Sequence, residues 1–342
     1  MNALLYLLRR IIFHDCTRDY CFKGDRTMLQ QVPAHKSLFH VSEKKGLPIG
    51  NLTSQFFANV YLNELDQFVK HRLKCRWYIR YVDDCILLST DRPQLEMWQQ
   101  QIELFLADRL ALHLKRGSLI RRVSSGADFL GYIVRPDYKL VRRRVVNNLK
   151  ARLAVFEGRI IDRHKVQGRT VTKINIASEP AVELRQTLAS YLGHYKHAAT
   201  HRLVQWIFKR YHWLNELFFI NGCHLYERYR YGGVFHNLRS QIRFFRSRLP
   251  GTVTLFRVGR YVELYDRDAE TVAALLRLKL RKGCRGMQCA VGFPFWFQER
   301  FIDRLLAAGH DVAVVAQGKS GQYVRQRYVT KVYRLQESVQ VL

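Results

Sequence analysis

The clearest pattern of apolar and polar positions lies between Tyr78 and Ser89, where β-branched and aromatic residues flank two adjacent carboxylates, Asp83 and Asp84. These two runs predict two strands, and a tight turn between them would hold both aspartates at its tip. Paired carboxylates repel each other unless a cation neutralises them, and magnesium prefers hard oxygen ligands of this kind. An ordinary hairpin turn is the alternative, because aspartate is common in turns.

Apolar residues at helical spacing predict amphipathic helices on both sides of this hairpin. The pattern also predicts a polar connector over residues 20–45, a short strand over Leu112 to Lys115, and a strand-like insert around Thr170 to Ile176. The predicted helical regions are residues 4–12, 54–69, 95–110 and 145–220. These elements together predict an α/β fold of the α+β kind.

Gly50 and Asn51 lie just before the predicted start of the second helix. The first backbone N–H groups of a helix have no partner within the helix and carry partial positive charge. This position therefore favours a phosphate group. The alternative is that Gly50 only permits a tight turn.

The chain of 342 residues has 57 Lys and Arg against 28 Asp and Glu, a net charge of +29. This charge predicts a polyanionic partner, for which nucleic acid is the natural choice. A membrane surface is the weaker alternative, because no apolar run approaches spanning length. The N-terminus lacks the charge order of a signal peptide, and the seven cysteines contain no Cys-x-x-Cys pair. We therefore expect a cytoplasmic protein with reduced thiols and without a zinc site.

Two stretches together resemble the reverse-transcriptase family, namely residues 46–59 and the Tyr-x-Asp-Asp turn that ends at Asp84. Tyr-x-Asp-Asp is the metal-binding turn of that family, and Gly50-x-x-x-Ser54-Gln55 matches its nucleotide-pocket motif. Intron-type members, which the chain also resembles, carry Gln where Ile49 stands and Pro where Gln55 stands. The sequence here is more similar to the branch found in diversity-generating retroelements.

This resemblance implies an RNA-directed DNA polymerase that copies template RNA into cDNA with two magnesium ions. It implies catalytic and metal-binding roles for Asp83 and Asp84, and a primer-gripping hairpin around Leu130 and Gly131. The nucleotide-binding residues that it implies are Gly50, Asn51, Ser54, Gln55 and Lys115. The implied partners are template RNA, an RNA–DNA heteroduplex or DNA, and a basic accessory protein.

The family's metal site has a third carboxylate, which stands upstream within an apolar run. Asp15 is the only upstream candidate in this chain, and a lone aspartate after apolar residues is usually a turn or cap residue. We therefore expect that the fingers and the first catalytic strand are missing from this chain. With two carboxylates instead of three, we expect little polymerase activity.

The patterns and the resemblance divide the chain into three regions. Residues 1–144 are expected to form a polymerase palm, and residues 145–249 a helical thumb followed by a connector rich in aromatic and basic residues. A separate small α/β domain is expected over residues 250–342, after the Pro250-Gly251 boundary. The alternation of aromatic and basic residues in this connector fits two alternatives. Its aromatic rings stack on unpaired bases, or they form the buried face of one helix.

Residues 255–269 resemble the start of the mismatch-recognition domain of MutS-type repair proteins. In that family a Phe-x-Glu pair inserts an aromatic ring beside the mismatched base, while the glutamate hydrogen-bonds the base. Tyr261 and Glu263 occupy these places, so the resemblance implies duplex and mismatch binding for both. The alternative is a packing domain whose Tyr261 lies in the core.

The likeness to this domain continues over Val291 to Pro294, a helix over Phe301 to Ala308 with Gly309 as its C-cap, and a strand over residues 311–317. The Gly-Lys-Ser sequence at residues 318–320 follows that strand, but it lacks the first glycine of a phosphate-binding loop. No ATP site is predicted there.

These features support hypotheses from different classes. The leading one is a reverse transcriptase, an enzyme whose C-terminal module binds duplexes or mismatches. The alternative is a catalytically inactive scaffold that binds nucleic acid, or a protein that binds mismatched DNA and in which the polymerase region is accessory.

Overall fold

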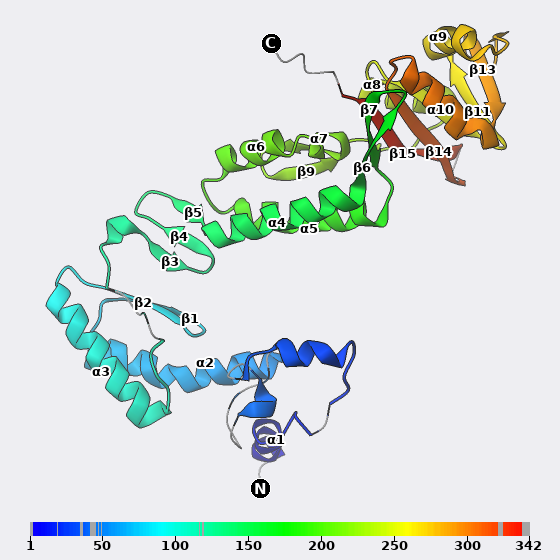
Figure 1. Cartoon of the computed structure of the whole chain (residues 1–342). Helices are drawn as coiled ribbons and strands as arrows, with labels where there is room; N and C mark the ends of the chain where they lie inside the picture. Colours follow the sequence, from blue (N-terminus) through cyan, green and yellow to red (C-terminus); the bar gives the residue numbers. More distant parts are fainter. Residues whose placement is uncertain are drawn as a thin grey trace. The chain divides into compact units, whose positions relative to one another are not determined.

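The computed structural model describes residues 3–18, 20–34, 37–41, 46, 48, 50–115, 117, 120–320 and 324–336. The chain divides into two compact units, residues 1–122 and residues 123–342 (Figure 1). Both units combine helices with antiparallel hairpins, and the second unit also contains a large mixed sheet. The predicted α/β class is therefore confirmed. In the described part of the chain, no helix has the length and apolar character needed to cross a membrane.

The first unit has its core where two long helices meet one face of a two-stranded hairpin. Leu65 and Val69 from the first of these helices and its extension are buried with Trp98 from the second. Phe68 stacks on Phe105, with 4.2 Å between ring centroids. The elements of this unit are α1 (Ala3–Ile12), η1 (Arg26–Gln31), η3 (Leu38–His40), α2 (Leu52–Gln67), the π-helical η4 (Phe68–Arg72), β1 (Trp77–Tyr81), β2 (Asp84–Leu88) and α3 (Arg92–Leu110).

Two expectations for the first unit differ from the structure. The amphipathic helix α1 forms, but none of its residues is buried. The predicted strand over Leu112 to Lys115 does not form, and the described residues there are irregular. The reason lies at the end of α3, where Ala111 adopts a left-handed conformation and Leu112 N donates to Leu106 O at 3.0 Å. The backbone after α3 therefore closes the helix end instead of pairing with a strand.

The second unit begins with a small sheet and a helical region. A core of leucine, isoleucine and aromatic side chains joins α4, α5, α6 and α7, with Leu153, Leu184 and Tyr195 fully buried. The elements are η5 (Val123–Ser125), β3 (Ala127–Phe129), β4 (Tyr132–Val134), β5 (Lys139–Val141), α4 (Arg143–Ile160), β6 (Ile161–Val166), β7 (Arg169–Asn175), α5 (Glu179–Tyr195), α6 (His201–Arg210), α7 (Leu214–Leu217), β8 (Phe218–Asn221), β9 (His224–Glu227) and α8 (Leu238–Arg248).

An eight-stranded sheet forms the rest of the second unit, in the order β12-β13-β11-β10-β14-β15-β7-β6. One face packs against α9 and α10 through residues such as Val262 and Leu264, and the other packs against α8 through Phe256 and Tyr265. The elements are β10 (Val253–Val258), β11 (Tyr261–Tyr265), α9 (Asp266–Leu276), β12 (Arg281–Lys282), β13 (Cys289–Pro294), η6 (Phe295–Phe297), α10 (Gln298–Ala307), β14 (Val312–Ser320) and β15 (Arg325–Leu335).

The sheet crosses the expected boundary at residue 250. The predicted insert near Thr170 is β7, and it pairs antiparallel with β15, from Val171 opposite Leu335 to Asn175 opposite Lys331. The hairpin β6–β7 leaves the helical region and completes the sheet of the C-terminal region (Figure 1). Residues 123–342 therefore form one compact unit, where the sequence predicted a thumb and a separate small domain.

Candidate functional site

The predicted Asp-Asp hairpin is present. Strands β1 and β2 pair antiparallel up to Tyr81 opposite Asp84, so Val82 and Asp83 form the turn. Both aspartates are exposed. Val82 has a φ of 54°, which is a genuine outlier for a β-branched residue. Such strain persists only where neighbouring groups hold it, and it is concentrated at functional sites.

Arg80 holds this turn and ties it to α2. Its Nη1 donates to Val82 O at 2.7 Å and to Asn59 Oδ1 at 3.0 Å. Its Nε and Nη2 donate to the two oxygens of Asp66, at 2.8 and 2.5 Å. The Tyr78 hydroxyl donates to Asp66 Oδ1 at 2.7 Å. Asp66 thus anchors the hairpin to α2.

The pKa shifts around Arg80 have a common cause. Burial acts to raise the pKa of Asp66, but the hydrogen bonds from Arg80 and Tyr78 hold that pKa below its usual value. The hydrogen bond to Asp66 raises the pKa of Arg80, so this guanidinium stays charged. Burial, followed by the hydrogen bond to Asp66, raises the pKa of Tyr78. The Asp66 carboxylate is therefore ionised down to acidic pH.

The motif at Gly50 lies at the start of α2, which begins two residues earlier than predicted. Asn51 is the N-cap, but its side chain makes no capping hydrogen bond. Gly50 has a φ of 108°, a conformation that favours glycine. Ser54 and Gln55 follow within the first turns of the helix. Ile49, the other residue that distinguishes the two branches, lies outside the described residues.

Leu130 and Gly131 form the turn of the predicted second hairpin, between β3 and β4. Their φ values of 49° and 90° fit the two-residue turn that such hairpins favour. A Cβ atom at Gly131 would lie 3.0 Å from Cε1 of His194, so α5 approaches this turn closely. The Tyr132 hydroxyl donates to His194 O at 2.9 Å. The hairpin is thus fixed on the helical region of the second unit.

Asp15 and Lys115, the other two residues of the polymerase hypothesis, lie in a turn and in an irregular segment. Asp15 Oδ1 accepts from Thr17 N at 3.0 Å and from Thr17 Oγ1 at 2.6 Å, and Asp15 pairs with Arg18 at 3.0 Å. These contacts belong to an ordinary turn. Lys115 lies in the irregular segment after α3. Among the residues that the structure describes, no three His, Cys, Asp or Glu side chains group as metal ligands.

In the C-terminal region, Tyr261 and Glu263 lie on one face of β11 but differ in exposure. Tyr261 starts the strand, directly after the turn at Gly259 and Arg260, and is 51% exposed. Glu263 is 5% exposed. Its Oε2 accepts from the Tyr265 hydroxyl at 2.5 Å and from Arg285 Nε at 3.1 Å. The aromatic ring is free to contact a ligand, whereas the carboxylate is engaged within the protein.

A second arginine approaches the same carboxylate. Arg281 Nη2 lies 4.0 Å from Glu263 Oε1. The guanidinium crosses Gly292 of the neighbouring strand, where a Cβ would meet Arg281 Nη2 at 3.1 Å. Glycine at this position thus leaves room for the arginine. The sequence pattern does not indicate either arginine, since nothing along the chain links residues 281 and 285 to residue 263.

The aromatic residues of the connector mostly pack inside the protein. Tyr229, Phe235 and Phe245 are buried, and Phe245 contacts Phe256 of the sheet. The alternative of a helix with a buried aromatic face is therefore the correct one for α8. Tyr226 and Tyr231 are exceptions at 45% and 46% exposure, although their rings stack on Phe219 and Phe235.

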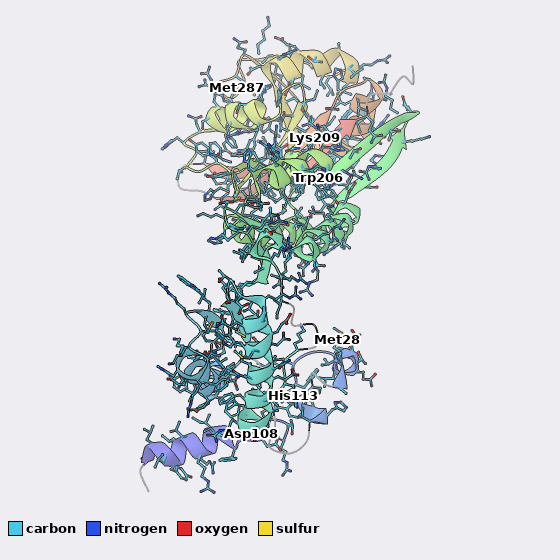
Figure 2. The ribbon with its side chains drawn as sticks, turned by 90° about the vertical axis from the view of Figure 1, so that its left-hand side faces the viewer. Met28, Asp108, His113, Trp206, Lys209 and Met287 are labelled. Atoms are coloured by element: carbon cyan, nitrogen blue, oxygen red, sulfur yellow. The ribbon has the colours of Figure 1, made fainter. Side chains whose placement is uncertain are left out.

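Helix α6 exposes a tryptophan together with a lysine. Trp206 and Lys209 belong to this helix (Figure 2). Lys150 Nζ of α4 lies 4.5 Å from the centre of the Trp206 ring, and Trp206 is 43% exposed. Aromatic and cationic groups together suit a nucleic-acid surface.

The Gly-Lys-Ser sequence at residues 318–320 belongs to β14. A phosphate-binding loop lies between a strand and the start of a helix. The position of these three residues within a strand agrees with the prediction that they are not such a loop. Helix α10 ends at Ala307, and Ala308 rather than Gly309 is its C-cap. Gly309 follows the cap with a φ of 90°, the left-handed conformation in which glycine commonly ends a helix.

Comparison with known proteins places the C-terminal region. Residues 237–334 match the family model described as MutS domain I. The DNA mismatch repair protein MutS of Chlorobaculum parvum is 40% identical over 75 residues, which are 21% of this chain and 9% of that protein. MutS of Leptospira interrogans is 26% identical over 98 residues, 28% of this chain and 11% of that protein. MutS of Chlorobium chlorochromatii is 38% identical over 72 residues, 21% of this chain and 8% of that protein.

The chain thus spans about a tenth of the length of these relatives. The likeness to MutS domain I expected from the sequence is confirmed. It begins at residue 237 and therefore includes α8, which the sequence assigned to the connector.

Proposed function

We propose that the second unit binds nucleic-acid duplexes and prefers distorted or mismatched ones, with Tyr261 as the residue that enters the base stack. The observation that carries this proposal is the exposure of Tyr261. Its side chain stands at the tip of the β10–β11 hairpin, while Val262, Leu264 and Tyr265 of the same strand are fully buried. The relatives with a similar region are named as DNA mismatch repair proteins, and they provide the second line of support.

The physical basis is a difference in unstacking cost. An aromatic wedge must unstack a base step, which costs a few kcal/mol in a matched duplex. The cost is smaller where the bases are mispaired, since their stacking and pairing are already weak. Tyrosine supplies the same π face as phenylalanine, so it fits this role. The net charge of +29 supplies the sequence-independent part of the affinity.

The experiment is a comparison of duplexes by fluorescence anisotropy with the full chain. A matched DNA duplex, the same duplex with one mismatch, and an RNA–DNA heteroduplex are titrated at several salt concentrations. We expect tighter binding to the mismatched duplex than to the matched one at every salt concentration, with affinities that fall steeply as salt rises. Equal affinities for matched and mismatched DNA would contradict the proposal.

We also propose that the first unit carries the Asp-Asp turn of an RNA-directed DNA polymerase. The specific observation is that Arg80 and Asp66 clamp the turn, so that Asp83 and Asp84 project from a rigid hairpin. Two adjacent exposed carboxylates fit one magnesium ion together with substrate phosphates. Such an ion would supply charge neutralisation at the triphosphate. The start of α2 behind Gly50, where the Asn51 side chain makes no capping hydrogen bond, suits a phosphate.

Primer extension on a poly-rA template with an oligo-dT primer tests this second proposal. The described residues offer two carboxylates at the turn and no group of three, so we expect weak synthesis from the chain as numbered. If the chain makes no cDNA but binds duplexes, it is an inactive binding scaffold.

A further inference from the structure

The tip of the β10–β11 hairpin lies beside an exposed aromatic turn. Tyr261 pairs with Pro294, the last residue of β13, and Phe295 N donates to Arg260 O at 3.0 Å. The 3-10 turn η6 that follows Pro294 is thus hydrogen-bonded to the hairpin. Its three aromatic residues are Phe295, Trp296 and Phe297, which are 43%, 69% and 41% exposed.

Within this turn, Trp296 is the most exposed residue. Phe297 is tied to α10 through Phe301, at 6.3 Å between ring centroids, and Phe301 in turn contacts the buried Phe293 at 4.3 Å. Trp296 contacts Phe297 at 6.2 Å. Phe297 and Phe301 therefore pack beneath the Trp296 indole, which is itself mostly exposed to solvent. The three exposed aromatic residues of this turn and the exposed Tyr261 of the neighbouring hairpin together form an apolar surface patch, and such patches mark binding surfaces.

The charges around the turn point to the class of ligand. The Arg257 guanidinium lies over the Phe295 ring, and Arg257 also donates to Gly259 O. Arg260 is exposed at the hairpin tip. Among the ion pairs of the described residues, neither arginine has a carboxylate partner. A surface of aromatic rings and unpaired guanidinium groups suits bases together with phosphates, since bases stack on the rings and phosphates bind arginine.

We propose that Trp296 is a second stacking residue and binds an unpaired nucleotide next to a duplex, while Arg257 and Arg260 bind the adjoining phosphates. This inference rests on the proposed function of the second unit and adds a second subsite to it. Tyr261 enters the distorted step, and Trp296 takes a base that no longer has a partner. The ligand of this subsite is therefore single-stranded nucleic acid continuous with a duplex.

The test measures the affinity of the full chain for a blunt DNA duplex and for the same duplex with a short oligothymidine overhang. Wild type is expected to bind the overhang duplex more tightly. Trp296→Ala is expected to lower affinity for the overhang duplex about tenfold and leave affinity for the blunt duplex unchanged, since stacking on one aromatic ring is worth that much. Trp296→Phe should retain most of the preference. Trp77→Ala is the matched control, because Trp77 is an exposed tryptophan of the first unit, and this variant should keep the ratio of the two affinities.

Two outcomes would overturn the inference. One is a Trp296→Ala variant that keeps the full preference for the overhang. The other is a wild type whose tryptophan emission shifts with neutral phosphatidylcholine vesicles and not with the overhang duplex, which would assign the surface to lipid. The matched and mismatched blunt duplexes measured in parallel test the proposed function separately. A mismatch preference without an overhang preference would refute only the role of Trp296.

Discussion

Tyr261 and Glu263 stand two residues apart on one face of β11, but only the tyrosine faces solvent. The Glu263 carboxylate lies beneath Arg281 and Arg285 and accepts from the Tyr265 hydroxyl. In the MutS-type motif both residues are expected to contact the mismatched base. If the proposed function holds, these exposures predict a division of roles, in which Tyr261 contacts the ligand and Glu263 positions the two arginines.

Tyr261→Ala should remove the preference for mismatched over matched duplex and leave the salt-dependent affinity in place. Stacking on a base is worth about 1–3 kcal/mol, so the preference should fall to near unity. Because the side chain is exposed, the midpoint of thermal unfolding should change by less than about 2 °C. Tyr261→Phe is the control and should behave like wild type. A large loss of thermal stability in Tyr261→Ala would assign the ring to packing.

Glu263→Gln should destabilise the second unit by about 1–3 kcal/mol, because the half-exposed Arg285 and the Tyr265 hydroxyl lose a buried, charged acceptor. Urea unfolding measures this loss. The ratio of affinities for mismatched and matched duplexes should stay close to that of wild type. Tyr265→Phe, which removes one donor to the same carboxylate, should show a smaller effect of the same kind. An altered ratio in a fully stable Glu263→Gln protein would show that the carboxylate reads the base directly.

Asp66→Asn should lower the stability of the first unit by about 3 kcal/mol at neutral pH, because Arg80 loses its paired carboxylate. The folded pKa of Asp66 is lowered from its usual 3.8. Its contribution is therefore complete above that value and is lost as pH falls below it. Wild type should lose stability on acidification below about pH 4, and the variant should lose less over the same range. Identical acid profiles, measured by denaturant unfolding from pH 2 to pH 7, would remove Asp66 from this role.

Asp83→Asn should abolish whatever primer extension the protein shows, while duplex binding changes by less than about twofold. The reason is that a lost ligand weakens metal binding at the turn, whereas one charge hardly alters a net charge of +29. Asp15→Asn is the matched control, since Asp15 belongs to a turn with Thr17 and Arg18. If primer extension were lost in Asp15→Asn and retained in Asp83→Asn, then Asp15 and not Asp83 would be the metal ligand.

Arg334→Leu should loosen the C-terminal sheet from the helical region. Arg334 donates to both oxygens of Glu216, at 3.1 and 2.9 Å, and to Asp311 Oδ2 at 3.0 Å. Both partners of the Glu216 pair are mostly buried, so removing the arginine should cost about 2–4 kcal/mol. The double variant Arg334→Leu with Glu216→Leu should recover part of this loss. No recovery in urea unfolding would show that the two residues are not coupled.

The local elements of this protein were largely predictable from its sequence. The hairpin at Asp83 and Asp84 follows from apolar residues on both sides of two turn-forming carboxylates, and α10 and its Gly309 cap follow from helical spacing. These features depend on residues near one another in the chain, and the backbone turns them into structure without help from distant segments. The likeness of the C-terminal region to MutS domain I was also readable, since its motif is continuous in sequence.

The tertiary structure alone decided how distant segments combine. Nothing in residues 169–175 indicates that they pair with β15, more than 150 positions away. An alternation of apolar and polar residues predicts a strand but not which strand it pairs with. The clamp between Asp66 and Arg80, the burial of Glu263 under Arg285, and the hydrogen bond that joins the aromatic turn at Phe295 to the β10–β11 hairpin are of the same kind. Whether a charged or aromatic side chain is buried, paired or exposed depends on what the fold brings against it. That environment is set by contacts between segments, which the pattern along the chain does not contain.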